Sequence, residues 1–288
     1  MGKLYVVATP IGNLKDITIR ALEILRGCSI IAAEDTRHIQ ILLKAYNIEN
    51  KKLISYHKYN EETRTKQVLE HLLEKNSDVV LVSDAGTPCI SDPGYKIVKA
   101  ARENNIEVIP IPGPSSLTAT LSVSGLPTDQ FYFLGFLPKE KDKRVKSLKM
   151  MREKSIKTFI VYESPKRIIS LIDIITEEFP NSTVCICREI TKLFEKTYYG
   201  KIEEVKKMVQ EDPYKEKGEY TIVVHYTEDI IKEQEKMLST EALIINEIIE
   251  QKVSLKDAIN LVAIKYQIKK RDVYNASLKL KEIIKNMI

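Results

Sequence analysis

The stretch VVLVSDAGTPCISDPG, residues 79–94, decides the fold of the N-terminal half of the chain. Its first four residues form an unbroken apolar run, which is typical of a strand buried on both faces of a parallel sheet. The loop that follows holds two aspartates, two glycines and two prolines. Glycine and proline at this density fix the path of the backbone, which folding alone does not require of so short a loop. We therefore expect this loop to hold a ligand.

On both sides of this strand, short apolar runs alternate with amphipathic helical patterns. One helix is expected to begin at Asp16 and to cover residues 16–28, and another covers residues 63–75. Such β–α alternation predicts a parallel sheet with helices on both faces and ligands beyond the carboxyl ends of its strands. The strands are expected at residues 4–9, 29–34, 52–57, 78–83 and 107–112.

Prolines and small residues gather between residues 110 and 127, which suits a hinge between two domains. After this segment the apolar runs come more densely and predict a second α/β domain with a mixed or antiparallel sheet. Its strands are expected at residues 131–138, 158–164, 183–190, 195–202 and 220–226.

From about residue 229 the pattern is helical, with three segments and N-caps expected at Ser239 or Thr240 and at Ser254. The short break before the last segment resembles a helix-turn-helix. The predicted architecture is therefore two α/β domains followed by a helical module. The predicted domain boundaries are 1–112, 113–228 and 229–288.

Composition and charge narrow the class of protein. The 288 residues are 43% hydrophobic and 30% charged, as expected of a globular protein and not of a disordered one. The opening residues lack the apolar core of a signal peptide, and the four cysteines are too scattered for a disulfide framework, so we expect a cytoplasmic protein. The net charge of +5 is uneven: residues 139–157 and residues 252–288 each carry nine basic and three acidic side chains. These faces are either solvated lysine-rich surfaces or contacts for a polyanion such as RNA.

The loops after the predicted strands contain the remaining sequence evidence for a ligand-binding site. The sequence contains neither the G-x-G-x-x-G nor the P-loop pattern, which excludes the usual nucleotide motifs. Each loop by itself is a weak signal, but four on one edge of a parallel sheet are much less expected by chance. The four loops are TPIGNL (9–14), AEDTRH (33–38), SDAGTPCISDPG (83–94) and PGPSSLTA (112–119).

Together these segments resemble the small-subunit rRNA cytidine-2′-O-methyltransferases of the tetrapyrrole-methylase-like family. The resemblance runs to about residue 226 and implies S-adenosylmethionine (SAM) as methyl donor, bound in a cleft between the two domains, and a homodimer. The implied target is the ribose 2′-hydroxyl of a cytidine, cytidine 1402 of the decoding site, in 16S rRNA or the assembling 30S particle. The segments that carry it are LYVVATPIGNLKDIT, AEDTR, SYHKYNE, LVSDAGTPCISDPG, PIPGPSSLTATLSVSGLP, FLGFLP, YESPKRI and REITKLFE.

The resemblance also implies the residues around SAM. Gly86 would leave room for the ligand, and Asp84 would accept hydrogen bonds from it or only cap its own loop. Ser115 and Ser116 begin a helix whose free N–H groups suit the methionine carboxylate, or they serve only as N-caps. The residues expected at SAM are Pro10, Gly12, Asp84, Gly86, Thr87, Pro88, Ser115, Ser116 and Tyr162.

Methyl transfer to a hydroxyl is an in-line displacement that needs alignment and removal of one proton. The sequence does not identify the base. Carboxylates near predicted strand ends, Glu189 among them, and His57 are candidate bases. In the alternative interpretation Glu163 and Arg188 form an internal ion pair, and His57 is a satisfied, partly buried histidine. The catalytic candidates are Glu34, Asp35, Arg37, Glu163 and Arg188. The candidates for contacts to the substrate are His57, Lys143, Arg144, Lys166, Arg167, Lys192, Lys269, Lys270 and Arg271.

Two other functions fit the same pattern. A methylase of this fold acts on tetrapyrrole carbons or on a modified histidine of a protein, although a small macrocycle needs neither the basic segment 139–157 nor the helical tail. A binding protein that docks on rRNA without catalysis is the other alternative, and the intact SDAGTP and PGPSS segments argue against it. No metal site is expected.

Overall fold

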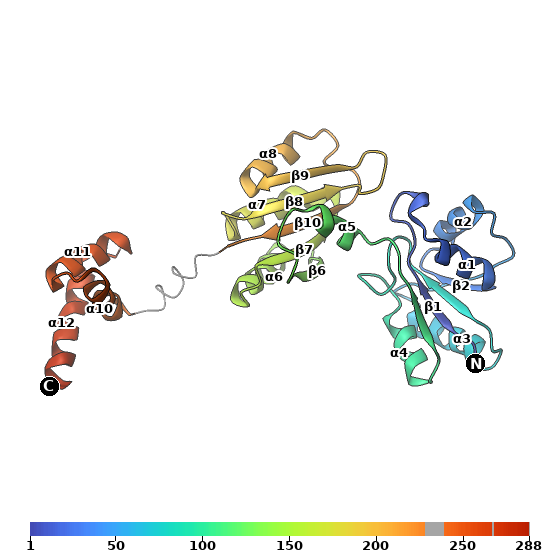
Figure 1. The fold of residues 1–288 in the computed structure, drawn as a ribbon, viewed down its shortest axis with the longest axis horizontal. Coiled ribbons are helices and arrows are strands. Elements are labelled where there is room, and N and C mark those ends of the chain that lie inside the picture. The colour runs from blue at the N-terminus through green and yellow to red at the C-terminus, as the bar shows by residue number, and fades with distance from the viewer. Residues whose placement is uncertain (228–238, 267, 288) are drawn as a thin grey trace. The chain divides into compact units, whose positions relative to one another are not determined.

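The computed structural model describes residues 1–227, 239–266 and 268–287, and side chains as far as residue 281. It divides the chain into two compact units, residues 1–226 and residues 227–288. The first unit contains two sheets, each with its own helices (Figure 1). We call them the N-terminal lobe, with strands β1 to β5, and the C-terminal lobe, with strands β6 to β10.

The sheet of the N-terminal lobe has the strand order β3-β2-β4-β1-β5, and every pair in it is parallel. The five predicted strands and the parallel sheet are confirmed. All four residues of β4 are buried, which explains the unbroken apolar run. The strands are β1 (Leu4–Val7), β2 (Ile30–Ala33), β3 (Lys52–Ser55), β4 (Val79–Val82) and β5 (Val108–Ile111).

Helices cover both faces of this sheet because successive strand residues point to opposite sides. Val80 packs on one face in a cluster with residues of α1 (Ile19–Gly27) and α2 (Thr36–Ala45). Val79 packs on the other face with residues of α3 (Glu61–Leu73) and α4 (Tyr95–Glu103). The two layers hold the strand ends, and the loops that follow them, in fixed positions.

The predicted start of the first helix at Asp16 is wrong. Asp16 ends a short 3₁₀ turn, η1 (Leu14–Asp16), and α1 begins after Thr18. The Thr18 hydroxyl accepts a hydrogen bond from the Ala21 N–H (3.1 Å), which satisfies one of the free donors at the helix start.

The sheet of the C-terminal lobe is mixed, in the order β6-β7-β10-β8-β9, with β6 and β7 parallel and the other pairs antiparallel. Helices α6 (Lys141–Glu153), α7 (Ile168–Glu178) and α8 (Ile202–Glu211) contribute to the core on one face, and α5 (Ser116–Val123) packs on the other. The strands are β6 (Tyr132–Phe136), β7 (Thr158–Glu163), β8 (Thr183–Arg188), β9 (Lys196–Lys201) and β10 (Tyr220–His225).

The second unit is helical, as predicted, and has a core of its own. It contains α10 (Thr240–Gln251), α11 (Leu255–Lys265) and α12 (Lys270–Met287). Ser239 and Ser254 are the N-caps, each accepting a hydrogen bond from a backbone N–H at 3.2 Å. The predicted start of this module near residue 229 lies outside the described residues. In the part of the chain that the structure describes, no helix combines the length and apolarity needed to cross a bilayer.

Candidate active site

The loop after β4 is held in an unusual backbone conformation. Four of its residues have positive φ: Gly86 (83°), Cys89 (72°), Ser91 (65°) and Gly94 (132°). For residues with a side chain, such as Cys89 and Ser91, this conformation costs roughly 1–3 kcal/mol each and persists only where the surroundings impose it. The glycines and prolines of residues 79–94 therefore hold the backbone of this loop in one defined conformation.

A two-hydrogen-bond bridge joins this loop to the loop after β1. The Thr9 N–H donates to the Gly86 carbonyl (2.9 Å), and the Gly86 N–H donates to the Thr9 carbonyl (3.0 Å). A Cβ at position 86 would lie 3.4 Å from Ile11 Cγ2, which is ordinary contact. Glycine is therefore favoured at position 86 by its backbone conformation, and the expected room for a ligand there stays a prediction.

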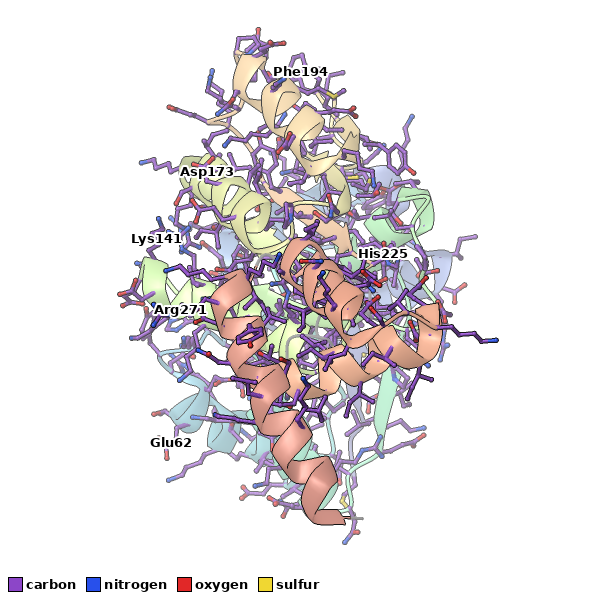
Figure 2. All side chains as sticks on the ribbon, turned by 90° about the vertical axis from the view of Figure 1, so that its left-hand side faces the viewer. Glu62, Lys141, Asp173, Phe194, His225 and Arg271 are labelled. Atoms are coloured by element: carbon purple, nitrogen blue, oxygen red, sulfur yellow. The ribbon has the colours of Figure 1, made fainter. Side chains whose placement is uncertain are left out.

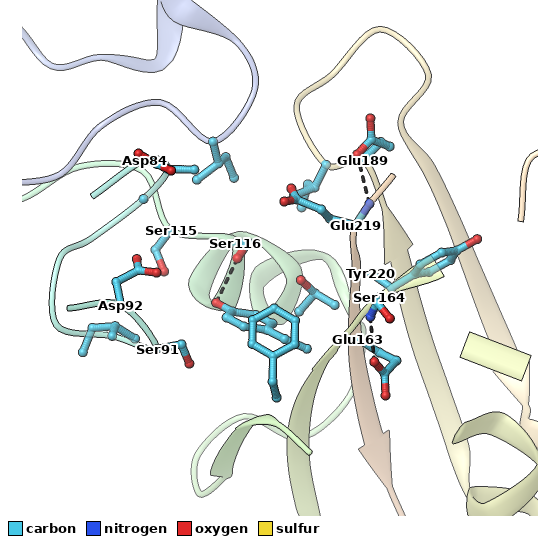
Figure 3. A pocket seen from close by; sticks show the side chains of 18 of the residues that line it. Asp84, Ser91, Asp92, Ser115, Ser116, Glu163, Ser164, Glu189, Glu219 and Tyr220 are labelled. Atoms are coloured by element: carbon cyan, nitrogen blue, oxygen red, sulfur yellow. Dashed lines mark hydrogen bonds between the residues drawn. The ribbon is translucent and has the colours of Figure 1, made fainter. Parts of the chain in front are cut away.

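The loops of the N-terminal lobe and the strand ends of the C-terminal lobe enclose a cavity of about 430 Å³ (Figure 3). We call it the large cavity. From the N-terminal lobe and the start of α5 it is lined by Ile11, Glu34, Asp84, Ala85, Gly86, Thr87, Ile90, Ser91, Asp92, Ser115 and Ser116. From the C-terminal lobe it is lined by Phe136, Tyr162, Glu163, Ser164, Pro165, Glu189, Ile190, Lys192, Glu219, Tyr220 and Thr221.

Acidic side chains dominate this lining. Among the described residues that line the cavity, Lys192 is the one basic residue, and its ammonium is bound by Glu189 (2.7 Å) and Glu219 (3.1 Å). On the N-terminal wall, burial raises the pKa of Asp92 to about 7, and the nearby charge of Glu34 adds to the effect. Burial and the charge of Asp84 likewise raise the pKa of Glu34. Carboxylates held close together away from water attract a cation, which would relieve their mutual repulsion.

The start of α5 offers the complementary feature. Ser115 is the N-cap residue, and its hydroxyl makes no capping hydrogen bond. The free N–H groups of a helix start favour an anion such as a carboxylate. Ser116 donates a hydrogen bond to the Tyr162 hydroxyl (2.8 Å), which ties this helix start to β7. Phe136 lies edge-on to the Tyr162 ring (5.5 Å between centroids), so one side of the cavity is aromatic.

Close contacts between the lobes close one side of the large cavity. A Cβ at Gly12 would lie 2.3 Å from Lys192 Cγ, and the Asn13 N–H donates to Thr191 Oγ1 (3.2 Å). A Cβ at Gly135 of β6 would lie 2.9 Å from the Ser91 hydroxyl. The predicted ligand residue Gly12 therefore serves first to let the two lobes approach.

The two catalytic candidates of the C-terminal lobe do not pair with each other. Glu163 is bound by the Arg167 guanidinium (2.6 Å) and by the Ser164 N–H (2.7 Å), and its side chain is buried. Arg188 donates to the Tyr214 carbonyl (2.8 Å) and lies 3.6 Å from Asp212. Arg188 does not line the large cavity.

The candidates of the AEDTR segment occupy different places. Glu34 lines the large cavity, whereas Asp35 caps α2, where it accepts from the Arg37 N–H (2.8 Å) and guanidinium (2.5 Å). The hydrogen bonds from Arg37 lower the pKa of Asp35. The Asp35 N–H donates to Asp84 (2.9 Å), so Asp35 helps to position this carboxylate without lining the large cavity itself.

The remaining candidates fall into three groups. The structure brings together Asp84, Gly86, Thr87, Ser115, Ser116, Tyr162 and Lys192 at the large cavity. Pro10 lines a second, small cavity, and the lining of the large one does not include Pro88, His57, Lys166 or Arg167. Lys143 is exposed on α6, Arg144 is buried against Ser170, and the exposed residues Lys269, Lys270 and Arg271 belong to the second unit.

Several lining residues escaped the sequence prediction. Ser91 and Asp92 belong to the loop at residues 83–94, and the unusual composition of this loop could have identified them as lining residues. His38 ends the AEDTRH segment and lines the small cavity. Glu219 precedes β10 without any motif, and only the pairing of β10 with β7 and β8 brings it to the cavity.

Comparison with known proteins identifies the family to which the chain is similar. Residues 3–206 match the family of Tetrapyrrole (Corrin/Porphyrin) Methylases. A ribosomal RNA small subunit methyltransferase I from Halalkalibacterium halodurans is 41% identical over 278 residues, covering 95% of this chain and 94% of that protein. The protein of the same name from Thermotoga maritima is 45% identical over 226 residues, covering 78% of this chain and 98% of that protein. The Thermotoga protein therefore has little length left for a counterpart of the second unit.

A solved structure shares the fold of the first unit. Uroporphyrin-III C-methyl transferase from Thermus thermophilus, complexed with S-adenyl homocysteine, superposes with a TM-score of 0.51 at 18% identity, covering 77% of this chain and 97% of that one. The chain therefore belongs to the tetrapyrrole methylases, and within them to the ribosomal RNA small subunit methyltransferase I family of SAM-dependent methyltransferases.

Proposed function

We propose that the chain transfers a methyl group from SAM, bound in the large cavity, to the ribose 2′-hydroxyl of a cytidine in 16S rRNA. By family resemblance the target is cytidine 1402, and the place of action is the cytoplasm. The observation that carries the proposal is the large cavity, which combines an acidic wall with the open helix start at Ser115. The name of these relatives, ribosomal RNA small subunit methyltransferase I, supports the choice of rRNA.

The lining of the large cavity fits SAM group by group. SAM supplies a methyl group on a positively charged sulfur, so its leaving group departs without needing an acid. The carboxylates of Glu34, Asp84 and Asp92 suit the cationic sulfonium and ammonium groups. The N-terminus of α5, with Ser115, suits the methionine carboxylate. Tyr162 and Phe136 offer aromatic surface for a heteroaromatic ring.

The protein's part in catalysis is alignment and exclusion of water. The Thr9–Gly86 bridge fixes one wall, and the contact between Gly12 and Lys192 fixes the opposite lobe against it. A donor and an acceptor held in line react far faster than the same groups free in water, because the loss of translational freedom has already occurred on binding.

We also propose that basic surfaces hold the rRNA. Lys143 on α6 and Lys269, Lys270 and Arg271 around the start of α12 are exposed, and Figure 2 shows Arg271 on the helical unit and Lys141 on α6. Arg144 is buried and is unsuited to a phosphate contact. The match to the Thermotoga relative spans 226 residues, the length of the first unit, which supports a catalytic core in the first unit and a binding role for the second.

The proposed enzyme acts as a homodimer, as the family resemblance implies. Sedimentation at nanomolar concentration should then show a species of twice 33.0 kDa. A fully active species of 33.0 kDa at the same concentration would contradict the dimer and leave the proposed reaction standing.

The test of the proposed reaction combines calorimetry and methyl transfer. The purified chain should bind SAM, and it should transfer a labelled methyl group to 30S particles whose 16S rRNA lacks the modification. Nuclease digestion should return the label as a 2′-O-methylcytidine. Label on a tetrapyrrole or a protein, or SAM binding without transfer to rRNA, would refute the proposal.

A further inference from the structure

A small cavity of about 110 Å³ adjoins the large one. It lies between the loop after β1, helix α2 and the start of the loop after β4. Its lining residues are Thr9, Pro10, Leu14, His38, Ile39, Ile41, Leu42, Ser83 and Asp84. Among the described residues, Asp84 is the one that lines both cavities. A group bound in the small cavity would therefore meet a group bound in the large one beside this carboxylate.

Asp84 holds His38 at this border. Asp84 Oδ2 lies 3.1 Å from His38 Nδ1, and Asp84 Oδ1 accepts the Asp35 N–H at 2.9 Å. A neutral His38 that carries its ring proton on Nδ1, beside this carboxylate, would present the lone pair on Nε2. The His38 side chain is 58% exposed, so it can exchange protons with solvent. A carboxylate beside one ring nitrogen of a histidine, with the other ring nitrogen directed to the substrate, is the arrangement used for general-base catalysis.

We propose that the small cavity receives the acceptor ribose and that His38, oriented by Asp84, removes the proton from its 2′-hydroxyl. This inference rests on the proposed function. The proton passes from the 2′-oxygen to His38 Nε2. The oxygen forms the bond to the transferred methyl carbon, while the carbon–sulfur bond of the donor breaks and its electron pair stays on sulfur. The proton then leaves His38 for solvent.

The surroundings of His38 favour this role. The buried apolar side chains Ile39 and Leu42 line the same small cavity and give it an apolar wall. The charged groups that face His38 from the neighbouring segments are the carboxylates of Asp84, Glu34 and Asp35. The nearby cation Arg37 is neutralised by Asp35 (2.5 Å). Glu34 lines only the large cavity, where the proposed donor cation lies.

The test uses single-turnover methyl transfer to 30S particles by the full-length chain. His38→Ala and His38→Gln should each slow transfer by about 100-fold or more, the usual contribution of a general base. Calorimetric affinity for SAM and filter-binding affinity for the particle should change by less than about twofold. Added imidazole should restore part of the rate in His38→Ala, because the site is open to solvent. The acid limb of the rate–pH profile should disappear in His38→Gln.

His225→Gln is the matched control. His225 pairs with Thr158 (2.9 Å) and lies five residues along β10 from the cavity residue Tyr220, about 16 Å at the rise of a strand. It should keep the transfer rate and the pH profile of the unaltered chain.

Three outcomes would overturn the inference while the proposed function stands. The first is an unchanged transfer rate in His38→Ala, and the second is a loss of rate that parallels a loss of SAM affinity. The third is a loss of rate that added imidazole does not restore in His38→Ala, together with a rate–pH profile of His38→Gln that keeps its acid limb. Absence of transfer to rRNA by the unaltered chain would overturn the proposed function and this inference together.

Discussion

Gly12 of the N-terminal lobe packs directly against Lys192 of the C-terminal lobe, so that a Cβ on Gly12 would lie 2.3 Å from Lys192 Cγ. Lys192 is also held by Glu189 and Glu219, which restricts how far its stem can move. Position 12 therefore sets how closely the two lobes approach around the large cavity.

Gly12→Val should weaken SAM binding by about tenfold or more while leaving each lobe folded. The branched side chain must displace Lys192 or separate the lobes, and overpacking of this kind typically costs about 1–3 kcal/mol. Calorimetry measures the affinity, and circular dichroism checks the fold. Gly27→Ala is the control, because a Cβ there meets nothing within 4 Å. Equal SAM affinity in both variants would show that the lobe contact does not shape the site.

Asp92→Asn should change how stability depends on pH. Burial raises the pKa of Asp92 to about 7, above its value near 4 in the unfolded chain. The folded state therefore binds the proton more tightly, so the stability this carboxyl contributes falls as pH rises from about 4 to 7 and is lost above 7. The asparagine variant should lack this slope and should be the more stable of the two at pH 8. Thermal unfolding between pH 5 and pH 8 measures it; parallel curves for both proteins would contradict the prediction.

Arg188→Ala should destabilise the fold without a direct effect on SAM. Arg188 lies beside Asp212, whose buried carboxylate also accepts hydrogen bonds from Tyr198 and from Lys196 (3.0 Å). Removing one partner of a buried ion pair typically costs roughly 3–5 kcal/mol. Urea unfolding should show the loss, and the affinity of the folded fraction for SAM should be unchanged. A stable variant with lost methyl transfer would instead make Arg188 catalytic.

Removal of residues 227–288 should leave a folded, SAM-binding protein with weaker affinity for RNA. The first unit has its own cores, and every described residue that lines the large cavity precedes residue 226. Each lost phosphate contact should flatten the log–log dependence of RNA affinity on salt by about 0.7. Filter binding across a salt series measures both effects. Full affinity with an unchanged slope would mean that Lys269, Lys270 and Arg271 do not touch RNA.

Local sequence patterns determined most of the architecture. The apolar run at residues 79–82, the β–α alternation and the N-caps at Ser239 and Ser254 depend on neighbours in the chain, so they predict strands, helices and the parallel sheet correctly. The same rule places the loops after parallel strands on one edge, and Asp84, Ser115 and Ser116 do meet at the large cavity. The start of α1 was misplaced because Asp16 and Thr18 are both good cap residues, and only the backbone geometry selects between them.

The partner of each charged side chain was decided only by the tertiary structure. Arg188 meets Asp212 and Glu163 meets Arg167, because β10 lies between β7 and β8 and keeps the two candidates apart. Glu219 reaches the large cavity, and Asp84 reaches His38, through the order of the strands and not through any local motif. Periodicity fixes which way a side chain points along its own strand, but distances between groups far apart in the sequence are fixed only when the sheets assemble and the lobes pack.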